Sequence, residues 1–280
     1  MSVHVRYYTD PACSASWAAE PALRRLMVEF GPDLQLEFVM GGLAREYSAG
    51  DAGWLVPEWL DAADRSGMPV DPRLWNEGPI RSTYPACMAV KAAAEQSEDA
   101  GYRYLRSVRE GLMCFRRKLD TTEALVEEAR QVGLDAARFR IDLESHATVE
   151  AFGSDLDRAR AVPDEARAAG EVASANGGER VTFPTLAVSG GDEATRWAFG
   201  GEPYERWRQV VVAAGGEPSE ERPGVLEALG RFGRMAAPEV EAVCDLRGPR
   251  GRAELWQLAA DWRVRPRRVL FGELWELANI

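Results

Sequence analysis

The chain has 280 residues, of which 46% are hydrophobic, so it is long enough to bury a sizeable core in two or three lobes. Its formal net charge of −11 argues against a nucleic-acid-binding surface and against attachment to an anionic membrane. No run reaches the roughly 18 apolar residues of a membrane span. The first residues lack the pattern of a signal peptide, so we expect a cytoplasmic protein.

The beginning of the chain predicts a strand, a turn, a helix and a second strand. Apolar residues alternate over 3–7, a turn signal follows at 10–11, and apolar residues recur at helical spacing over 18–30. Residues 34–39, LQLEFV, read as another strand. Together these elements make a βαβ unit, whose crossover is expected to be right-handed.

Cys13 is the most chemically informative residue, because it lies between the end of the first strand and the beginning of the helix. Unpaired N–H groups and the helix dipole favour negative charge there, and both lower the pKa of a thiol. Cys13 could instead be a small buried apolar residue, but the turn before it favours a reactive thiolate. We expect the other three cysteines, Cys87, Cys114 and Cys244, to lie in the core. The two histidines, His4 and His146, are far apart in the sequence, so we predict no metal site.

The middle of the chain changes to helical periods from about residue 54 to 167. Glycine and proline mark the joins between six expected helices, at 55–65, 83–97, 99–117, 121–132, 135–145 and 147–160. Small residues over 168–180 predict a connector. A hairpin of strands within 181–188 and 196–199 and a helix over 204–214 follow, giving a ββα unit.

The last segment, 217–280, predicts a separate small lobe. Helices are expected at 224–235, 238–244 and 252–262, and 269–277 is ambiguous. A basic run follows the third helix. Because acidic residues surround it, we interpret it as a solvated face or an intramolecular ion-pair seam: Arg263, Arg265, Arg267, Arg268.

The βαβ and ββα halves, with Cys13 at the first helix, resemble the thioredoxin fold. Three stretches are similar to the cytoplasmic DsbA-like family, which includes FrnE-type proteins and the ClpXP adaptors that bind the regulator Spx: YTDPACSASWAAEP with FVMGGL, RSTYPACMAVKAA, and TFPT. We therefore expect an α/β protein in three parts. These are a thioredoxin-like domain over 1–45 and 180–216, an all-helical insertion over 46–179, and a mostly helical C-terminal lobe over 217–280.

The sequence departs from that family at its usual Cys-x-x-Cys motif, because Ser16 stands in place of the second cysteine. A hydroxyl three residues after Cys13 lies on the same helical face and can hydrogen-bond a thiolate, but it cannot form a disulfide. If the motif is chemically active, it therefore uses one thiol. Ser16 could also be an ordinary first-turn residue, or mark a lineage that exchanged redox chemistry for partner binding.

The resemblance implies further site residues around Cys13. It implies a cis peptide bond before Pro184 that faces the Cys13 sulfur, with Thr182 and Phe183 forming the edge that meets a substrate. Trp17 and the Phe183 ring would give the site an aromatic mouth. Asp10 is a turn residue that could also take up the proton of the thiol, and we count it among the candidate substrate-binding residues.

Three functions remain open. The first is thiol–disulfide exchange by Cys13, with glutathione or mycothiol as a co-substrate that resolves the mixed disulfide. The second is a cis-trans isomerase that adds Cys13 to a small conjugated substrate. The third is a non-catalytic adaptor for a protein partner. We expect no bound cofactor, and no nucleic-acid or membrane partner. The partner is a small thiol, a small conjugated molecule or a protein disulfide, and a homodimer is left open.

Overall fold

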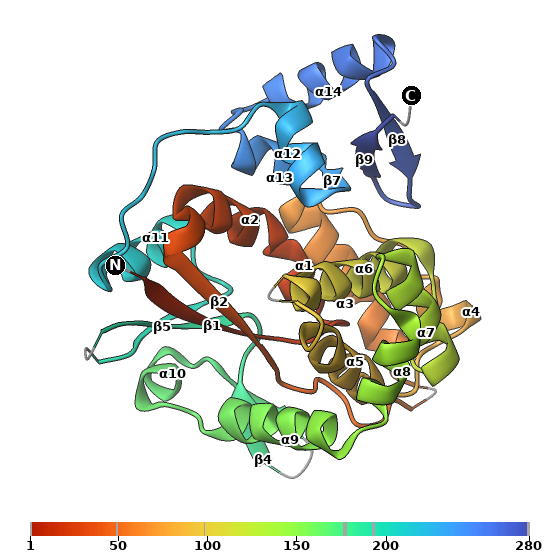
Figure 1. The fold of residues 1–280 in the computed structure, drawn as a ribbon, viewed down its shortest axis with the longest axis vertical. Helices are drawn as coiled ribbons and strands as arrows, with labels where there is room; N and C mark the ends of the chain where they lie inside the picture. Colours follow the sequence, from red (N-terminus) through yellow and green to blue (C-terminus); the bar gives the residue numbers. More distant parts are fainter. Residues whose placement is uncertain (1, 49, 98, 176–177, 192–193, 279–280) are drawn as a thin grey trace.

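The computed structural model describes residues 2–48, 50–97, 99–175, 178–191 and 194–278, and is built around one four-stranded sheet (Figure 1). The strand order is β2-β1-β5-β6, in which β1 and β2 are parallel and the other pairs are antiparallel. The strands are β1 (Val3–Thr9), β2 (Leu34–Met40), β5 (Thr185–Gly190) and β6 (Arg196–Phe199). A parallel half joined to an antiparallel half is the predicted arrangement, so the thioredoxin fold is confirmed.

Both faces of the sheet are covered. The strand β1 lies in the middle of the sheet, and its side chains point alternately to one face and the other. On one face, Val5 and Tyr7 pack with Trp207 of α11 (Tyr204–Ala213) and with the apolar side of α2 (Glu20–Glu29). On the other face, Tyr8 packs in a cluster with Cys13, Phe183 and Ala159.

The first helix differs from the prediction, because the expected helix over 18–30 is two helices. The first, α1 (Ser14–Ala18), begins directly after Cys13, and α2 begins at Glu20. Pro21 stands within the first two positions of α2, where its missing N–H is tolerated. In the interior of one continuous helix the same proline would remove a hydrogen bond, so the helix is interrupted at Ala19. A 3₁₀ turn, η1 (Gly31–Asp33), leads into β2.

The six helices predicted for the insertion are present. Side chains of Thr121, Asp135 and Ser145 each accept a backbone N–H at a helix start, which fixes three of the boundaries. Two short helices, α4 and α10, were not predicted. The helices are α3 (Ala52–Ser66), α4 (Leu74–Glu77), α5 (Tyr84–Ala94), α6 (Ala100–Phe115), α7 (Thr122–Gln131), α8 (Ala136–Leu143), α9 (His146–Arg160) and α10 (Asp164–Ala169).

The small-residue connector over 168–180 is not irregular, and the insertion is therefore not all-helical. Two short antiparallel strands, β3 (Val172–Ala175) and β4 (Gly178–Val181), pair with each other there. Their alanine, serine and glycine residues give no apolar alternation, which is why the pattern did not reveal them.

The C-terminal lobe contains the three predicted helices and also a three-stranded sheet, so the expectation of a mostly helical lobe was incomplete. The helices are α12 (Val225–Phe232), α13 (Ala237–Val243) and α14 (Arg250–Ala260). The sheet has the order β7-β9-β8, formed by β7 (Met235–Ala236), β8 (Val264–Arg268) and β9 (Glu273–Leu277). The basic run lies largely on β8, where Arg265 and Arg268 pair with Glu276 and Glu273 of β9, so the predicted ion-pair seam is confirmed.

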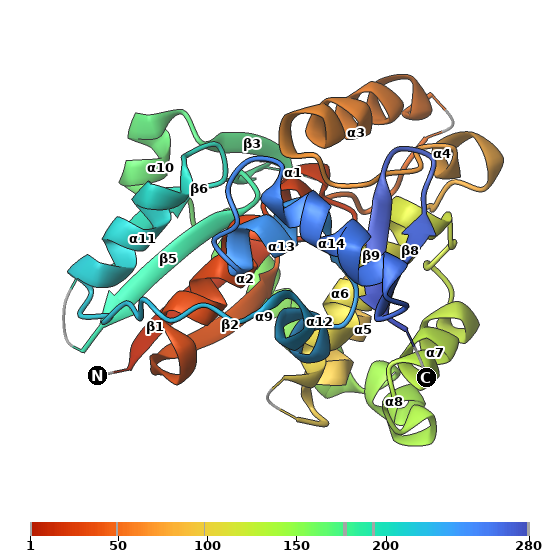
Figure 2. The ribbon, with the colours of Figure 1, turned by 90° about the horizontal axis from the view of Figure 1, so that it is seen from above.

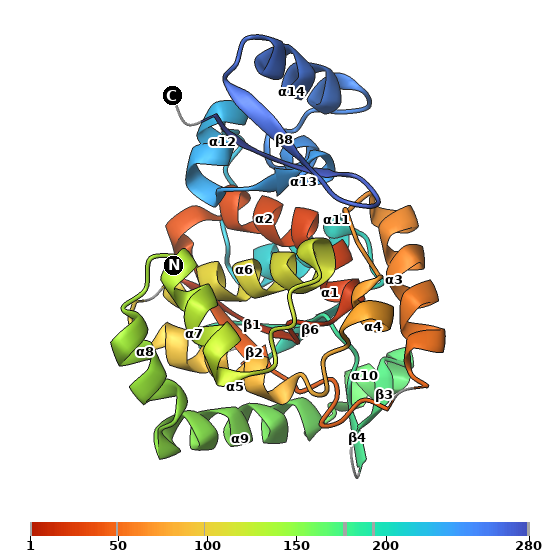
Figure 3. The same ribbon diagram turned by 90° about the vertical axis from the view of Figure 1, so that its right-hand side faces the viewer.

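The C-terminal lobe sits against α2 and α6 rather than on the sheet. Figure 3 shows α12 and α13 beside α2, with α14 farther out, and Figure 2 looks down on the same lobe from above. The tip of the β8–β9 hairpin also reaches the insertion, because Phe271 and Val70 exchange backbone hydrogen bonds of 3.1 Å. Within the described ranges, no helix is both long and apolar enough to cross a membrane.

Candidate functional site

Cys13 lies at the junction that the sequence predicted, between β1 and α1. It is the N-cap of α1, and its Sγ accepts the backbone N–H of Ser16 at 3.4 Å. The Cys13 N–H in turn donates to the carbonyl of Asp10 at 3.2 Å, which closes the turn. An N-cap sulfur in this position has its lone pairs directed at the unpaired N–H groups of the first helical turn.

The loop before β5 forms the other side of the site. The peptide bond between Phe183 and Pro184 is cis, and the Cys13 Sγ lies 3.9 Å from the carbonyl oxygen of Phe183. Residues 170 positions apart in the chain are thus in contact. The structure brings together the cysteine and the proline loop, as the resemblance implies.

The surroundings of Cys13 raise the pKa of its thiol, which corrects the expectation of a lowered pKa. Only 6% of the residue is exposed, and burial raises the pKa of the Cys13 thiol above its ordinary value. Hydrogen bonds from Ser16 and the charge of Arg180 lower the pKa, while Asp10 raises it. Burial is the largest of these effects. The sequence indicated the helix N-terminus, which lowers the pKa of the thiol, but it did not show the burial, which raises that pKa.

Asp10 anchors the surrounding loops rather than lying at an open surface. It is fully buried, and its carboxylate accepts the N–H groups of Ala12 at 2.8 Å and Leu43 at 2.6 Å, the hydroxyl of Thr83 at 2.7 Å and the thiol of Cys87 at 3.3 Å. Four donors therefore occupy the carboxylate that was considered a substrate contact. Burial, and next the charge of Asp10 and its hydrogen bond, raise the pKa of the Cys87 thiol well above its ordinary value.

Ser16 is connected to the helical insertion. Its hydroxyl accepts a hydrogen bond of 2.8 Å from Thr9, and the Thr9 hydroxyl is contacted by the guanidinium of Arg109 from α6. Arg109 also forms an ion pair with Glu20 at the start of α2. The hydroxyl in place of the second cysteine is thus held in a buried polar chain.

The aromatic mouth expected from Trp17 and Phe183 is absent. Trp17 is fully buried, its indole N–H donates to the Pro69 carbonyl at 2.9 Å, and Arg106 lies 4.4 Å from its ring centroid. The Phe183 ring instead covers Gly41, where an added Cβ would lie 2.0 Å from a ring carbon. The hydroxyl of Thr182, also expected at the substrate edge, donates to Glu171.

Two residues that the sequence did not indicate interact electrostatically with Cys13. The Arg180 guanidinium is 4.1 Å from the centroid of the Phe183 ring, and the residue is 7% exposed. The Tyr47 hydroxyl is buried, and this burial, with smaller contributions from the charges of Asp10 and Cys13, raises its pKa. Arg180 stands four residues before Pro184, but a single arginine in a short strand carries no signal that could have identified it.

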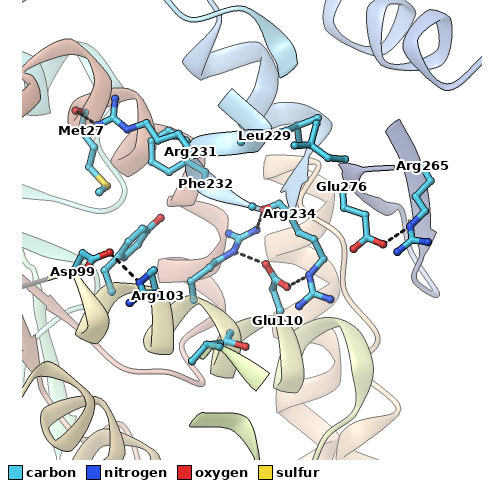
Figure 4. Close-up of a pocket in the computed structure, with 17 residues that line it drawn as sticks. Met27, Asp99, Arg103, Glu110, Leu229, Arg231, Phe232, Arg234, Arg265 and Glu276 are labelled. Atoms are coloured by element: carbon cyan, nitrogen blue, oxygen red, sulfur yellow. Dashed lines mark hydrogen bonds and ion pairs between the residues drawn. The ribbon is translucent and has the colours of Figure 1, made fainter. Parts of the chain in front are cut away.

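A cavity lies away from Cys13. It has a volume of about 680 Å³ and lies between α6 and the C-terminal lobe (Figure 4). Three of the arginines that line it are paired with carboxylates: Arg234 with Glu110 at 2.7 Å, Arg103 with Asp99 at 2.9 Å, and Arg265 with Glu276 at 2.6 Å. Among the described residues no cluster of side chains could hold a metal ion.

Comparison with known proteins supports the fold. A family model described as thioredoxin matches residues 7–162. Among solved structures, an inferred protein disulfide isomerase from Nitrosomonas europaea has a TM-score of 0.62 and 19% identity, covering 76% of this chain and 97% of that one. The cytosolic disulfide reductase DsbM from Pseudomonas aeruginosa has a TM-score of 0.58 and 18% identity, covering 75% and 97%.

Curated relatives extend over more of the chain than these structures do. The ClpXP adapter protein SpxH of Halalkalibacterium halodurans is 27% identical over 280 residues, which cover 96% of this chain and 86% of that protein. The protein of the same name from Bacillus subtilis is 25% identical over 279 residues, covering 98% and 89%. The alignments with the relatives therefore include most of the C-terminal lobe, whereas each of the two solved structures leaves about a quarter of this chain uncovered.

Proposed function

This chain belongs to the thioredoxin family, and from that premise we propose that it catalyses thiol–disulfide exchange through the single sulfur of Cys13. One observation carries the proposal: the Cys13 Sγ lies between the N–H of Ser16 at 3.4 Å and the Phe183 carbonyl at 3.9 Å. The N–H stabilises a thiolate, and the loop that carries the carbonyl can meet a substrate chain.

The proposed reaction has two exchanges. The Cys13 thiolate attacks one sulfur of a mixed disulfide between a protein and a small thiol, a new S–S bond forms, and the protein sulfur leaves as a thiolate. A second molecule of the small thiol then attacks the Cys13 mixed disulfide. It releases a small-molecule disulfide and restores the Cys13 thiolate, so sulfur and electrons balance without another oxidant. Glutathione or mycothiol would serve as the small thiol.

The use of one cysteine follows from the surroundings of the motif. All four cysteines carry free thiols, and Ser16 cannot close a disulfide with Cys13. Cys87 is fully buried and bonded to Asp10. A small thiol from solution is therefore the resolving group that this arrangement supports, rather than a second cysteine of the same chain.

The test is the reduction of a glutathionylated peptide by excess glutathione, with the full chain and two cysteine variants. Cys13→Ser removes the proposed nucleophile, and we expect the reduction rate to fall by a factor of ~100 or more. Cys244→Ser is the matched control, because Cys244 lies in the C-terminal lobe, and it should keep the original rate. A Cys13→Ser protein with unchanged activity would overturn the proposal.

A second candidate function, a protein adapter for ClpXP, is favoured by one specific observation. The adapter relatives align over 96% and 98% of the chain, whereas the disulfide reductase structure covers 75% of it. The additional lobe exposes two large aromatic side chains, Trp256 at 46% and Trp262 at 83%, and exposed aromatic residues are enriched at protein interfaces.

The two candidates differ in what Cys13→Ser does. For an adapter, deletion of the gene should lengthen the half-life of at least one ClpXP substrate, and expression of the Cys13→Ser chain should restore rapid degradation. A Trp256→Ala and Trp262→Ala double variant should fail to restore it. Proteome-wide half-lives measured with and without active ClpXP provide the readout. Unchanged half-lives in the deletion strain would exclude the adapter function.

A further inference from the structure

The cavity between α6 and the C-terminal lobe is separate from the exchange site, because neither Cys13 nor Pro184 lines it. Its lining residues come from α2 and α6 on one side and from α12 and the β8–β9 hairpin on the other (Figure 4). Its volume of about 680 Å³ falls within the range of roughly 300–1,000 Å³ that is usual for small-molecule sites. The cavity therefore has the size and the concave, multi-element lining of a ligand site.

The lining of this cavity carries more positive than negative charge, although the chain as a whole is acidic. Five arginines and three acidic residues line the cavity, whereas the formal net charge of the chain is −11. Two of these acids are each shared by two arginines. Glu110 lies 2.9 Å from Arg106 and 2.7 Å from Arg234, and Glu276 pairs with two arginines of β8. Because a cavity with an excess of one charge attracts the opposite charge, this lining favours an anion.

Arg231 is the lining arginine that forms no ion pair with any carboxylate of the described residues. Its guanidinium lies 5.0 Å from the centroid of the Phe232 ring, and one terminal nitrogen donates to the Met27 carbonyl at 3.3 Å. These two contacts hold the side chain at the cavity wall, and Figure 4 shows it beside Met27 and Phe232. The residue is exposed, so its remaining N–H donors can bind an anionic group that enters the cavity.

The remainder of the lining suits an apolar body rather than a bare inorganic ion. Six large apolar or aromatic residues contribute to the wall: Met27, Tyr102, Val132, Leu229, Phe232 and Leu277. An inorganic anion would leave these side chains in contact with water. An organic anion with an apolar body would cover them and also meet the guanidinium groups, which is the usual division of a ligand site into an apolar wall and a few placed polar groups.

We propose that this cavity binds an organic anion with an apolar body, and that Arg231 holds its carboxylate, sulfonate or phosphate group. The proposal goes beyond the exchange function, since the ligand does not contact Cys13. A molecule in this cavity contacts α2, α6 and α12 together. Its binding therefore stabilises the attachment of the C-terminal lobe to the rest of the chain.

Two dyes with the same ring system test the proposal on the full chain. Anilinonaphthalene sulfonate carries one negative charge, whereas phenylnaphthylamine is the same molecule without the sulfonate. Fluorescence titration gives the dissociation constant of each dye. We expect saturable binding of both dyes and tighter binding of the sulfonate. The ratio of the two dissociation constants reports recognition of the anionic group, because the apolar contacts are common to both dyes.

Arg231→Gln should raise the dissociation constant of the sulfonate dye about tenfold, the lower end for loss of a hydrogen bond to a charged group, and leave that of the neutral dye unchanged. Arg231→Lys should keep part of the preference, because the charge remains. Arg160→Gln is the matched control. It removes the same charge from an exposed residue at the end of α9, and it should leave both dissociation constants unchanged. Circular dichroism establishes that each variant is folded.

Gly230→Leu tests the apolar part of the cavity. Gly230 lines the cavity on α12, and a Cβ added there meets no atom within 4 Å, so the larger side chain is accommodated at the cost of cavity volume. Leucine is also a better helix former than glycine, so the variant should fold. Binding of both dyes should weaken by similar factors. Unchanged binding of both would show that the dyes do not occupy this cavity, which would overturn the proposal.

Two further variants locate the dyes relative to other sites. Cys13→Ser and Trp256→Ala should each bind the sulfonate dye as tightly as the unaltered chain. If either variant loses the dye while Arg231→Gln keeps it, the dye occupies the exchange site or the exposed face of α14, and the proposal is overturned. The glutathionylated-peptide assay is independent of these titrations. A chain that binds the dye at Arg231 but does not catalyse exchange would therefore retain the anion site and lose the exchange function.

Competition against the sulfonate dye defines the ligand class. Naphthoate, an aromatic carboxylate, should displace the dye, whereas inorganic phosphate at the same concentration should not. Equal displacement by phosphate would overturn the role of the apolar wall. The absence of saturable binding of either dye to the unaltered chain, or equal weakening by Arg231→Gln and Arg160→Gln, would overturn the site itself.

Discussion

The guanidinium of Arg106 lies 2.8 Å from the carboxylate of Glu239, and this ion pair joins the helical insertion to the C-terminal lobe. Both side chains are almost completely buried, and Glu239 also accepts the N–H of Ala236 at 2.6 Å at the start of α13. Arg24 on α2 reaches the same carboxylate at 3.1 Å. One buried acid thus connects all three parts of the molecule.

Glu239→Ala is expected to destabilise the protein strongly, because it leaves Arg106 and Arg24 with less buried negative charge. Removal of one partner of a buried pair typically costs about 3–5 kcal/mol. Glu127→Ala is the control, since its pair with Arg130 is exposed and should contribute less than about 1 kcal/mol. Denaturant unfolding measures both free energies. Equal, small losses would show that the buried network does not stabilise the lobe.

The pH dependence of Cys13 alkylation follows from its raised pKa. Only the thiolate reacts, so the iodoacetamide rate should reach half its maximum above pH ~8.5, the value of a free cysteine. Arg180→Gln should move this midpoint higher still, because the charge of Arg180 lowers the pKa of the thiol. A midpoint near pH 6 would contradict the burial effect and restore the activated thiolate expected from the sequence.

The same shift affects stability with a definite sign. A thiol whose pKa is raised by folding binds its proton more tightly in the folded state than in the unfolded chain. Its contribution is complete below pH ~8.5 and is lost as the pH rises through the folded-state pKa. Cys87, Cys114 and Cys244 shift in the same direction. The free energy of unfolding should therefore decrease as the pH rises above 8.5, which chemical denaturation at a series of pH values can measure.

The sequence predicted most helices, both halves of the sheet and the meeting of Cys13 with Pro184. Those features depend on local periodicity, or on a pattern shared by a whole family. The state of the thiol depends instead on contacts across long separations. Trp17 is removed from the expected mouth by Pro69 and Arg106, and the buried Nε of Arg180 has no hydrogen-bond partner among the described residues. Neither feature produces a periodic pattern of residues in the sequence from which it could be predicted.

Gly41 directly follows β2 and leaves room for the Phe183 ring. Gly41→Ala would place a Cβ 2.0 Å from the ring, so Phe183 must move away from its position beside Cys13. We expect a loss of about 1–3 kcal/mol in stability from this overpacking, and slower glutathione-dependent exchange. Gly153→Ala, in α9, meets no atom within 4 Å and should stabilise the protein by up to about 1 kcal/mol. Exchange at the original rate in Gly41→Ala would show that the position of Phe183 is unimportant.

Ser16→Cys tests whether the motif is limited to one thiol by this residue alone. The Ser16 N–H is 3.4 Å from the Cys13 Sγ, so a sulfur at this position has a near neighbour with which to form a disulfide. After mild oxidation, thiol counting should find two fewer thiols in the variant than in its reduced form, whereas the original chain should lose none. The new sulfur replaces a hydroxyl that accepts from Thr9, which should cost about 1 kcal/mol of stability.

The control for this variant is Ser14→Cys. Ser14 is the residue adjacent to Cys13, and its hydroxyl donates to Glu58 at 2.5 Å, toward α3 rather than along the face of α1 that Ser16 shares with Cys13. Side chains three positions apart face each other on a helix and adjacent ones do not, so Ser14→Cys should keep all its thiols after the same oxidation. If Ser16→Cys also keeps them, the absence of dithiol chemistry is due to the buried geometry around Thr9 and Arg109 rather than to the identity of residue 16.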